Sequence, residues 1–286
     1  MSAKAMLAVT SASLLLVWAL LVLASPPHPS PAPDAARLPE STSLRSPVFG
    51  PSGIACHARD GRMFVVGDRG HLAELSRDGR ELSRRRLRGD LEDVAILPDG
   101  RLLILDESTA EIFLYDYDRE REQMRWSLDV EALLGVAHAP RGGNGFEGLA
   151  FVAGGAADGS GLLYLAHQHR PAMVVVAAFG PQRGARRLGS ESVRARWSLE
   201  RYRDAKAVTF VPALDRFLIV TDATDRLLVV RSDGTVTSEL PLPGRQQEGA
   251  CLDGDGTLWV TDDRARRLLV FPKAIEVLDD LIVEEP

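Results

Sequence analysis

The chain has 286 residues, enough for one large domain or two of ordinary size. Its formal net charge of −6 at pH 7, with no concentrated basic run, argues against a nucleic-acid-binding groove, so we expect no nucleic acid among its partners.

An apolar run without any charge extends from Ala5 to Ala24 and follows one cation, Lys4. A signal-peptide core spans roughly 7–15 apolar residues, whereas a membrane-spanning helix needs about 20. We therefore predict an N-terminal hydrophobic helix within residues 1–25, which is either an uncleaved signal anchor or a signal peptide cleaved before Ser25. Lys4 stays in the cytoplasm in both cases. The remainder is then held on the cell membrane, in the periplasm or outside the cell, or is secreted if the signal is cleaved.

A proline-rich stretch from Pro26 to Pro33 predicts a stiff, extended spacer. The polar residues after it continue the linker, so we assign residues 26–46 to a linker and 47–286 to one folded domain. A first strand is expected near Pro47-Val48-Phe49.

The folded domain repeats one short pattern, in which a polar residue precedes a small residue and an apolar run. Its leading positions are separated by about 40, 55, 59 and 42 residues, spacings typical of β-propeller blades. The five copies are Ser52–Cys56, Glu92–Ile96, Glu147–Phe151, Lys206–Phe210 and Glu248–Leu252.

Each copy begins a series of short strands. Asp-Gly turns such as Asp60-Gly61 and Asp99-Gly100 separate the first strand from the second in several repeats, because glycine readily supplies the positive φ of a tight hairpin. A third apolar strand follows in every repeat, and the matching segments 125–128 and 196–199, both Arg-Trp-Ser-Leu, indicate a fourth. We predict an all-β, five-bladed propeller with four antiparallel strands per blade. The extra residues at about 129–143 and 180–190 are interpreted as surface loops.

These motifs resemble the SdiA-regulated family of bacterial propeller proteins, which is distantly similar to NHL-repeat proteins. The resemblance covers roughly residues 46–272 and is carried by segments 51–55, 90–92 and above all 145–150, Gly-Phe-Glu-Gly-Leu-Ala. It implies a five-bladed propeller, a membrane-tethered location outside the cytoplasm and a bound calcium ion, with no established reaction. Two departures weaken the calcium expectation: Lys206 stands where the family tends to have a small residue, and Ala166-His167-Gln168 stands where it often has Ala-Lys-Glu.

Propeller geometry predicts where the polar residues gather. The first strand of each blade lies nearest the axis, and its start lies beside the end of the antiparallel second strand. These starts and ends should therefore surround the axis on one face, which we call the axial face. The candidate metal ligands there are Glu92, Glu147, Glu248, Asp222, Asp262, Asp68 and Glu107.

Three glutamates brought together in this way repel one another. At about 6 Å and an effective dielectric constant near 20, each pair costs roughly 3 kcal/mol. A calcium ion would offset the repulsion, because it accepts 6–8 oxygen ligands in loose geometry. Alternatively, Lys206 neutralises the carboxylates by a salt bridge without any metal. The sequence leaves both interpretations open.

Two further pairs of residues have chemical potential. His167 and His169 lie on one side of an extended segment and could bind a transition metal, but without a third ligand at fixed spacing a solvated loop is the preferred interpretation. Cys56 and Cys251 fall in the first strands of repeats one and five, which are neighbours in a closed ring. They differ by one step within the motif, so we expect them to face opposite ways and to be two buried small residues rather than a disulfide.

The first functional hypothesis is a non-enzymatic, membrane-tethered propeller that binds calcium and presents its axial face to an unknown protein or small-molecule ligand. The alternative is a calcium-dependent hydrolase of lactonase, esterase or phytase-like type, which rests on analogy between propellers. Such a hydrolase needs a base near the metal, and Asp222, Asp262 and His167 are the candidates.

Overall fold

The computed structural model describes residues 36–57, 60–137, 145–155, 159–180 and 186–283. The expected N-terminal hydrophobic helix and the proline-rich spacer lie outside these residues. Within the described part of the chain, no helix combines the length and the apolar character needed to cross a membrane.

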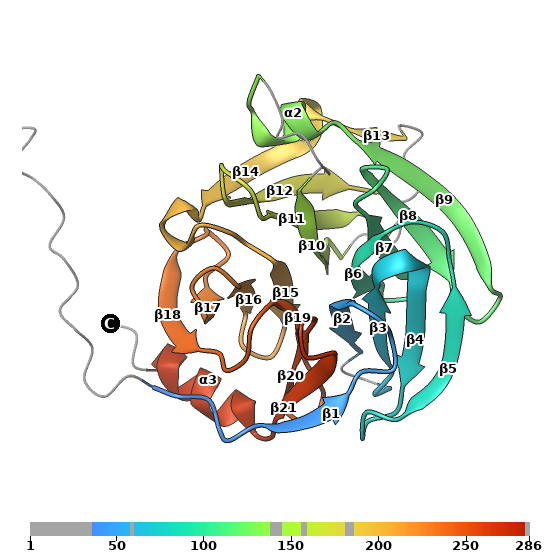
Figure 1. Cartoon of the computed structure of the whole chain (residues 1–286). Coiled ribbons are helices and arrows are strands. Elements are labelled where there is room, and N and C mark those ends of the chain that lie inside the picture. Colours follow the sequence, from blue (N-terminus) through green and yellow to red (C-terminus); the bar gives the residue numbers. More distant parts are fainter. Residues whose placement is uncertain (1–35, 58–59, 138–144, 156–158, 181–185, 284–286) are drawn as a thin grey trace, which may run out of the picture. The chain divides into compact units, whose positions relative to one another are not determined.

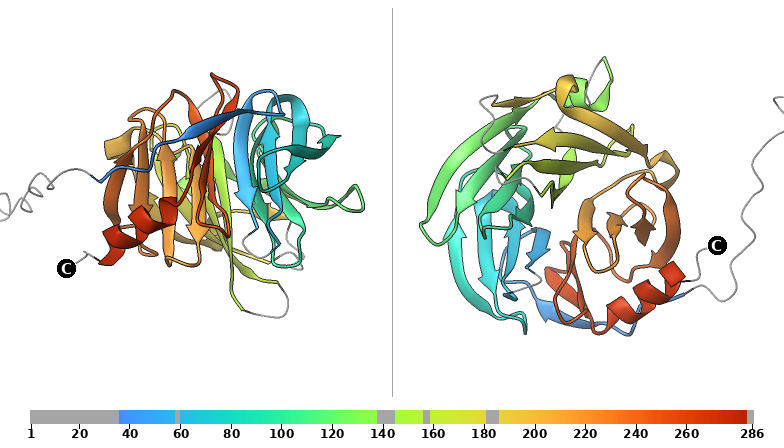
Figure 2. Two further views of the ribbon diagram at one scale, coloured as in Figure 1. Left: turned by 90° about the horizontal axis from the view of Figure 1, so that it is seen from below. Right: turned by 180° about the vertical axis from the view of Figure 1, so that it is seen from behind.

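The described strands form five sheets arranged radially around one axis, which confirms the predicted five-bladed propeller (Figure 1). Short apolar strands joined by tight turns produce this fold; at the turn after the first strand of blade 2, for example, Gly100 adopts a φ of 83°. Seen from below and from behind, the innermost strands run roughly along the axis (Figure 2).

Each blade has four antiparallel strands that follow one another from the axis outwards. Blade 1 contains β2 (Pro51–Cys56), β3 (Met63–Gly67), β4 (His71–Leu75) and β5 (Glu81–Arg86). Blade 2 contains β6 (Leu91–Ile96), β7 (Leu102–Asp106), β8 (Glu111–Asp116) and β9 (Arg121–Leu128). Blade 3 contains β10 (Phe146–Ala153), β11 (Gly161–His167), β12 (Met173–Phe179) and β14 (Val193–Ser198). Blade 4 contains β15 (Ala207–Val211), β16 (Arg216–Thr221), β17 (Arg226–Val230) and β18 (Val236–Pro241). Blade 5 contains β19 (Gln247–Leu252), β20 (Leu258–Asp262), β21 (Arg267–Phe271) and, from the other end of the chain, β1 (Thr42–Arg45).

Strand β1 closes the ring. It pairs antiparallel with β21, from Thr42 opposite Val270 to Arg45 opposite Arg267, so both ends of the folded chain build blade 5. Residues 42–45 therefore belong to the propeller, although the sequence pattern placed them in the linker. The first strand expected near residues 47–49 is not formed; those residues are a bend before β2.

A disulfide between Cys56 and Cys251 ties the same two blades together near the axis, with their Cα atoms 5.6 Å apart. The expectation that these cysteines face apart was wrong, because blades in a ring meet through opposite faces. Cys251 and Ile54 both belong to the apolar cluster between blades 5 and 1, and Cys56, two residues after Ile54, packs against it. A one-step difference within the motif is thus what brings the two sulfurs together.

The two insertions and the C-terminus carry additional elements. The first insertion includes helix α2 (Val130–Leu134), capped by Asp129, whose side chain accepts a hydrogen bond from the Ala132 N–H. In the second, β13 (Arg187–Leu188) adds a parallel fifth strand to blade 2. Single 3₁₀ turns occur at η1 (Asp68–Gly70), η2 (Ser190–Ser192) and η3 (Glu200–Tyr202). The C-terminal helix α3 (Ala274–Val283), which the sequence pattern did not predict, buries Ala274 and Leu278 in the cluster between blades 4 and 5.

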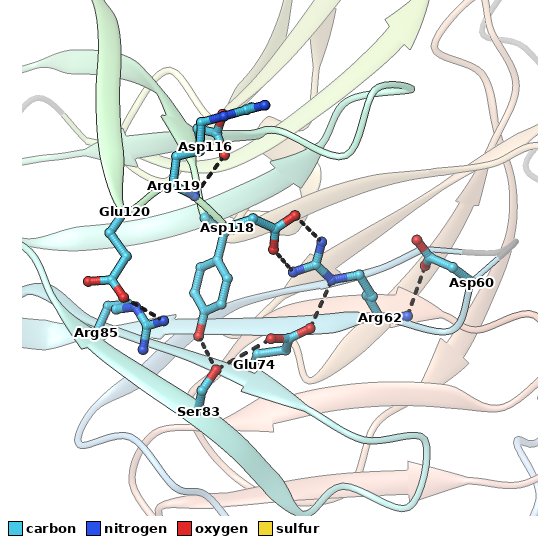
Figure 3. A network of polar contacts seen from close by, with 10 residues as sticks. Asp60, Arg62, Glu74, Ser83, Arg85, Asp116, Asp118, Arg119 and Glu120 are labelled. Carbon is cyan, nitrogen blue, oxygen red and sulfur yellow. Dashed lines mark hydrogen bonds and ion pairs between the residues drawn. The ribbon is translucent and has the colours of Figure 1, made fainter.

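Apolar side chains fill the space between neighbouring blades, and polar networks supplement them. Between blades 1 and 2, the Arg62 guanidinium donates to Glu74 (Nε to Oε1, 2.8 Å) and to Asp118 (Nη2 to Oδ1, 2.9 Å) (Figure 3). Ser83 from β5 lies 2.7 Å from the Tyr117 hydroxyl in the turn between β8 and β9. This network links the two blades through side chains.

Candidate functional site: the axial face

The polar residue that leads each repeat does lie at the axial face. In four blades the pairing of the first strand is interrupted at this residue by a β-bulge, as between Leu91 and Asp93 in β6. A bulge turns a side chain out of the regular alternation of the strand. In blade 4 the equivalent residue, Lys206, immediately precedes β15. The five leading residues are Ser52, Glu92, Glu147, Lys206 and Glu248.

Four of these side chains are linked by direct contacts. The Lys206 ammonium lies 3.0 Å from Glu248 Oε2 and 3.5 Å from Glu147 Oε2. Glu147 also shares a hydrogen bond with Glu92. The chain of contacts therefore runs from Glu92 through Glu147 and Lys206 to Glu248, which is the convergence that the repeat predicted.

Burial raises the pKa of two of these glutamates, Glu92 and Glu248. Glu92 and Glu147 are 9% and 6% exposed. Burial first, and then the neighbouring Glu147, raise the pKa of Glu92 to about 11, so at neutral pH Glu92 holds the proton that it donates to Glu147. Burial likewise raises the pKa of Glu248 to about 7, despite the nearby Lys206. The carboxylates raise the pKa of Lys206 against the effect of its burial, so its ammonium stays charged.

A second group of oxygens extends from Glu92 towards the seam between blades 2 and 3. One carboxylate oxygen each from Asp90, Glu92 and Glu107 lies within 4.8 Å of the other two. The Gly145 N–H from blade 3 donates to Glu107 Oε1 at 3.2 Å. Burial and then Glu147 raise the pKa of Glu107.

This trio fits a calcium ion. Calcium–oxygen distances are roughly 2.3–2.6 Å, so oxygens bound to one ion lie up to about 5 Å apart. Asp90, Glu92 and Glu107 meet that condition, and their donors are the oxygens that calcium prefers. Asp90 was missed as a candidate ligand; a pattern shared by repeats two and four, with an aspartate two residues before the leading residue, would have identified it.

The remaining predicted ligands lie further from this trio or have other partners. Asp222 Oδ1 accepts a hydrogen bond from the Gln246 N–H at 2.7 Å. Asp262 is 1% exposed, and its Oδ2 accepts hydrogen bonds from Arg267 Nε and Nη2, each at 3.0 Å. It therefore stabilises the turn between β20 and β21. Burial, followed by Asp90 and Asp263, raises the pKa of Asp68, a residue of the same face.

His167 is fully buried rather than part of a solvated loop, so that expectation was wrong. Its Nδ1 lies 3.1 Å from the His169 carbonyl and 3.0 Å from the Pro171 carbonyl, and its ring packs edge-on against Phe146. The next residue, Gln168, reaches the axial face and donates a hydrogen bond to Glu147. His167 therefore organises the end of β11.

Asp93 is a buried carboxyl that the sequence pattern did not single out. It is 5% exposed, and it accepts hydrogen bonds from the N–H groups of Leu149 (2.7 Å) and Val94 (2.8 Å). The Leu149 bond joins β6 to β10. Burial raises its pKa well above the usual range. The equivalent position in blade 3 is Gly148. The backbones of blades 3 and 4 are so close there that a Cβ on Gly148 would lie 2.8 Å from Ala207 Cα. Between blades 2 and 3 the side chain of Asp93 makes the contact instead.

Fold and site together define a five-bladed propeller with an acidic axial face. Residues 49–201, more than half of the chain, match the model of the family described as SdiA-regulated, and the chain belongs to that family. A comparison with curated proteins found no match.

Solved structures are similar to this chain at low sequence identity. Glutaminyl cyclase from Myxococcus xanthus is 15% identical with a TM-score of 0.53, over 82% of this chain and 97% of that one. Virginiamycin B lyase from Staphylococcus aureus is 10% identical with a TM-score of 0.49, over 81% of this chain and 98% of that one. At these identities the comparison concerns the fold alone.

Proposed function

We propose that this protein is a non-catalytic propeller that holds one calcium ion at the axial face and presents that face to a ligand or partner outside the cytoplasm. The observation that carries the proposal is the trio Asp90, Glu92 and Glu107, whose oxygens lie within 4.8 Å of one another. The proposed ion lies towards the seam between blades 2 and 3 rather than on the axis.

Lys206 and calcium then have separate tasks. Lys206 balances Glu147 and Glu248, which it contacts directly. Asp90, Glu92 and Glu107 provide the proposed ligands of the ion. When bound, calcium supplies positive charge that holds Glu92 ionised, so the two interpretations that the sequence left open combine instead of competing.

A location outside the cytoplasm is supported by the Cys56–Cys251 disulfide, because such bonds persist in oxidising compartments. The apolar run from Ala5 to Ala24 provides the proposed membrane anchor. A mature protein that begins at Ser25 and is freely soluble would contradict the anchor.

We do not extend the proposal to hydrolysis. Of the candidate bases, Asp262 is paired with Arg267, and His167 is buried with its Nδ1 directed at two carbonyls. Asp222 accepts the Gln246 N–H. A screen of lactone, ester and phosphate substrates with and without calcium tests the alternative, and turnover lost in Glu147→Gln would support it.

The direct test is a calcium titration by calorimetry on the purified full-length protein. We expect one tight site in the wild type and at least about tenfold weaker binding in Glu107→Gln, which removes one ligand charge but keeps its shape. The matched control is Glu200→Gln, an exposed residue of η3. Absence of any heat of binding in the wild type, or unchanged binding in Glu107→Gln, would refute the calcium site.

A further inference from the structure

Among the described residues, one oxygen atom of blade 4 and one of blade 5 are buried without a hydrogen-bond partner. They are Asp204 Oδ1, just before β15, and Gln247 Oε1, at the start of β19. Asp204 is 8% exposed and Gln247 is fully buried. A buried polar atom left unpaired costs roughly 1–3 kcal/mol, so a missing partner is expected.

The other polar atoms of these side chains are already engaged. Asp204 Oδ2 accepts the Ala223 N–H at 2.9 Å, and Gln247 Nε2 donates to the Pro243 carbonyl at 3.1 Å. Asp222 Oδ1 accepts the Gln246 N–H at 2.7 Å, and this bond joins the two blades. The two unpartnered atoms, a carboxylate oxygen of Asp204 and the amide oxygen of Gln247, are therefore both hydrogen-bond acceptors.

Equivalent positions of the repeat connect the seam between blades 4 and 5 with the trio Asp90, Glu92 and Glu107. Asp204 and Asp222 occupy the positions in blade 4 that Asp90 and Glu107 occupy in blade 2. The connection to the next blade also recurs, since Gly145 N–H donates to Glu107 as Gln246 N–H donates to Asp222. The difference is the residue between them, which is Glu92 in blade 2 and Lys206 in blade 4.

We propose that the seam between blades 4 and 5 is a second site for a hard cation, formed by Asp204, Asp222 and the amide oxygen of Gln247. Oxygen donors without a competing nitrogen or sulfur ligand suit calcium and similar ions. The site is weaker than the first, because the ammonium of Lys206 stands where blade 2 has the carboxyl of Glu92. The formal charge of Asp204, Lys206 and Asp222 is therefore −1, compared with −3 for Asp90, Glu92 and Glu107. It does not depend on the first site being occupied.

The test is a calcium titration of the full-length protein extended to millimolar concentrations at constant ionic strength. We expect two classes of site. Asp204→Asn should weaken the second class at least about tenfold and leave the tight class intact, whereas Glu107→Gln should do the reverse. Asp280→Asn, an exposed aspartate of α3, is the matched control and should change neither class.

A melt in chelator establishes whether each variant is folded. Should Asp204→Asn fail to fold, Gln247→Met keeps the size of the side chain, removes the amide oxygen and should weaken the same class. A tight class alone in the wild type, or a weak class that survives both variants, would overturn the second site and leave the first untouched. A weak class without a tight one would overturn the first site and support the second.

Discussion

At the scale of single residues, Lys206 has the largest influence on the axial face. It is one of three lysines in a chain that otherwise uses arginine. A compact ammonium with three donors fits between two carboxylates, where a planar guanidinium would need a flat, forked arrangement. With Glu147 and Glu248 in contact, Lys206 is a cation built into the chain.

Replacing Lys206 by serine should strengthen calcium binding. The substitution removes a positive charge that repels the ion. We expect calcium to bind roughly tenfold more tightly, which corresponds to about 1.4 kcal/mol of binding free energy. In chelator the variant should melt at a lower temperature than the wild type, because Glu147 and Glu248 lose their counter-ion. Calcium should then raise its melting temperature strongly through ligand linkage. Paired titrations and melts measure both effects. A variant that is destabilised and that millimolar calcium does not restore would show that Lys206 alone balances the carboxylates.

The sequence predicted the residues that the repeat itself marks. Glu92, Glu147 and Glu248 share a place in a five-fold pattern, so their convergence followed from the fold. Asp90 and Asp204 lie two residues ahead of that pattern, in connections whose path depends on packing against the next blade. His167 was misjudged because its burial depends on Phe146 and on the carbonyls of the following loop, which no local pattern encodes.

At the scale of elements, the inner strands of blades 5 and 1 are where the ring closes. Two separate features act there: β1 completes blade 5, and the disulfide joins β2 to β19.

Strands and hairpin turns were predictable because their alternation and Asp-Gly turns are local. The place of β1 was not, since its partner β21 lies more than 200 residues away along the chain.

The disulfide can be tested by a double-mutant cycle. Cys56→Ala and Cys251→Ala should each lower the free energy of unfolding by about 2–5 kcal/mol, because either one releases the long loop in the unfolded chain. The double variant should lose scarcely more than a single one, since the bond can be broken only once. Chemical unfolding of the three variants and the wild type, with and without reductant, measures this. Additive and smaller losses that ignore reductant would instead indicate two independent buried residues.

At the scale of the whole molecule, the fold concentrates acidic groups around one end of its axis. The chain as a whole carries a net charge of only −6, yet Glu92, Glu147 and Glu248 from three blades meet within a chain of contacts that includes a single ammonium. Closure of the ring imposes this concentration, because each first strand must begin near the axis. The stability of the propeller should therefore respond to pH and calcium together.

Without calcium, stability should fall as the pH rises from about 5 to 8. Glu92 and Glu248 have folded-state pKa values of about 11 and about 7, both above the ordinary glutamate value of 4.5. From about pH 5 to 8 the folded protein keeps protons on these glutamates that the unfolded chain has released. Raising the pH therefore favours unfolding. A group that is fully protonated only in the folded state costs up to about 1.4 kcal/mol per pH unit. Lys206 does not alter this trend, because its raised pKa matters only at much higher pH.

Calcium should oppose the loss at the alkaline end, where Glu92 can ionise against the bound ion instead of against Glu147. Chemical unfolding at half-unit pH steps, in chelator and in calcium, measures the two curves. Glu92→Gln fixes the neutral state of this side chain, so its curve in chelator should be flatter than that of the wild type and should not respond to calcium through the first site. A wild-type free energy of unfolding that stays constant between pH 5 and 8 in chelator would contradict this prediction. It would mean that other groups of the protein already balance the charge of the buried glutamates, so that the axial face requires no ion.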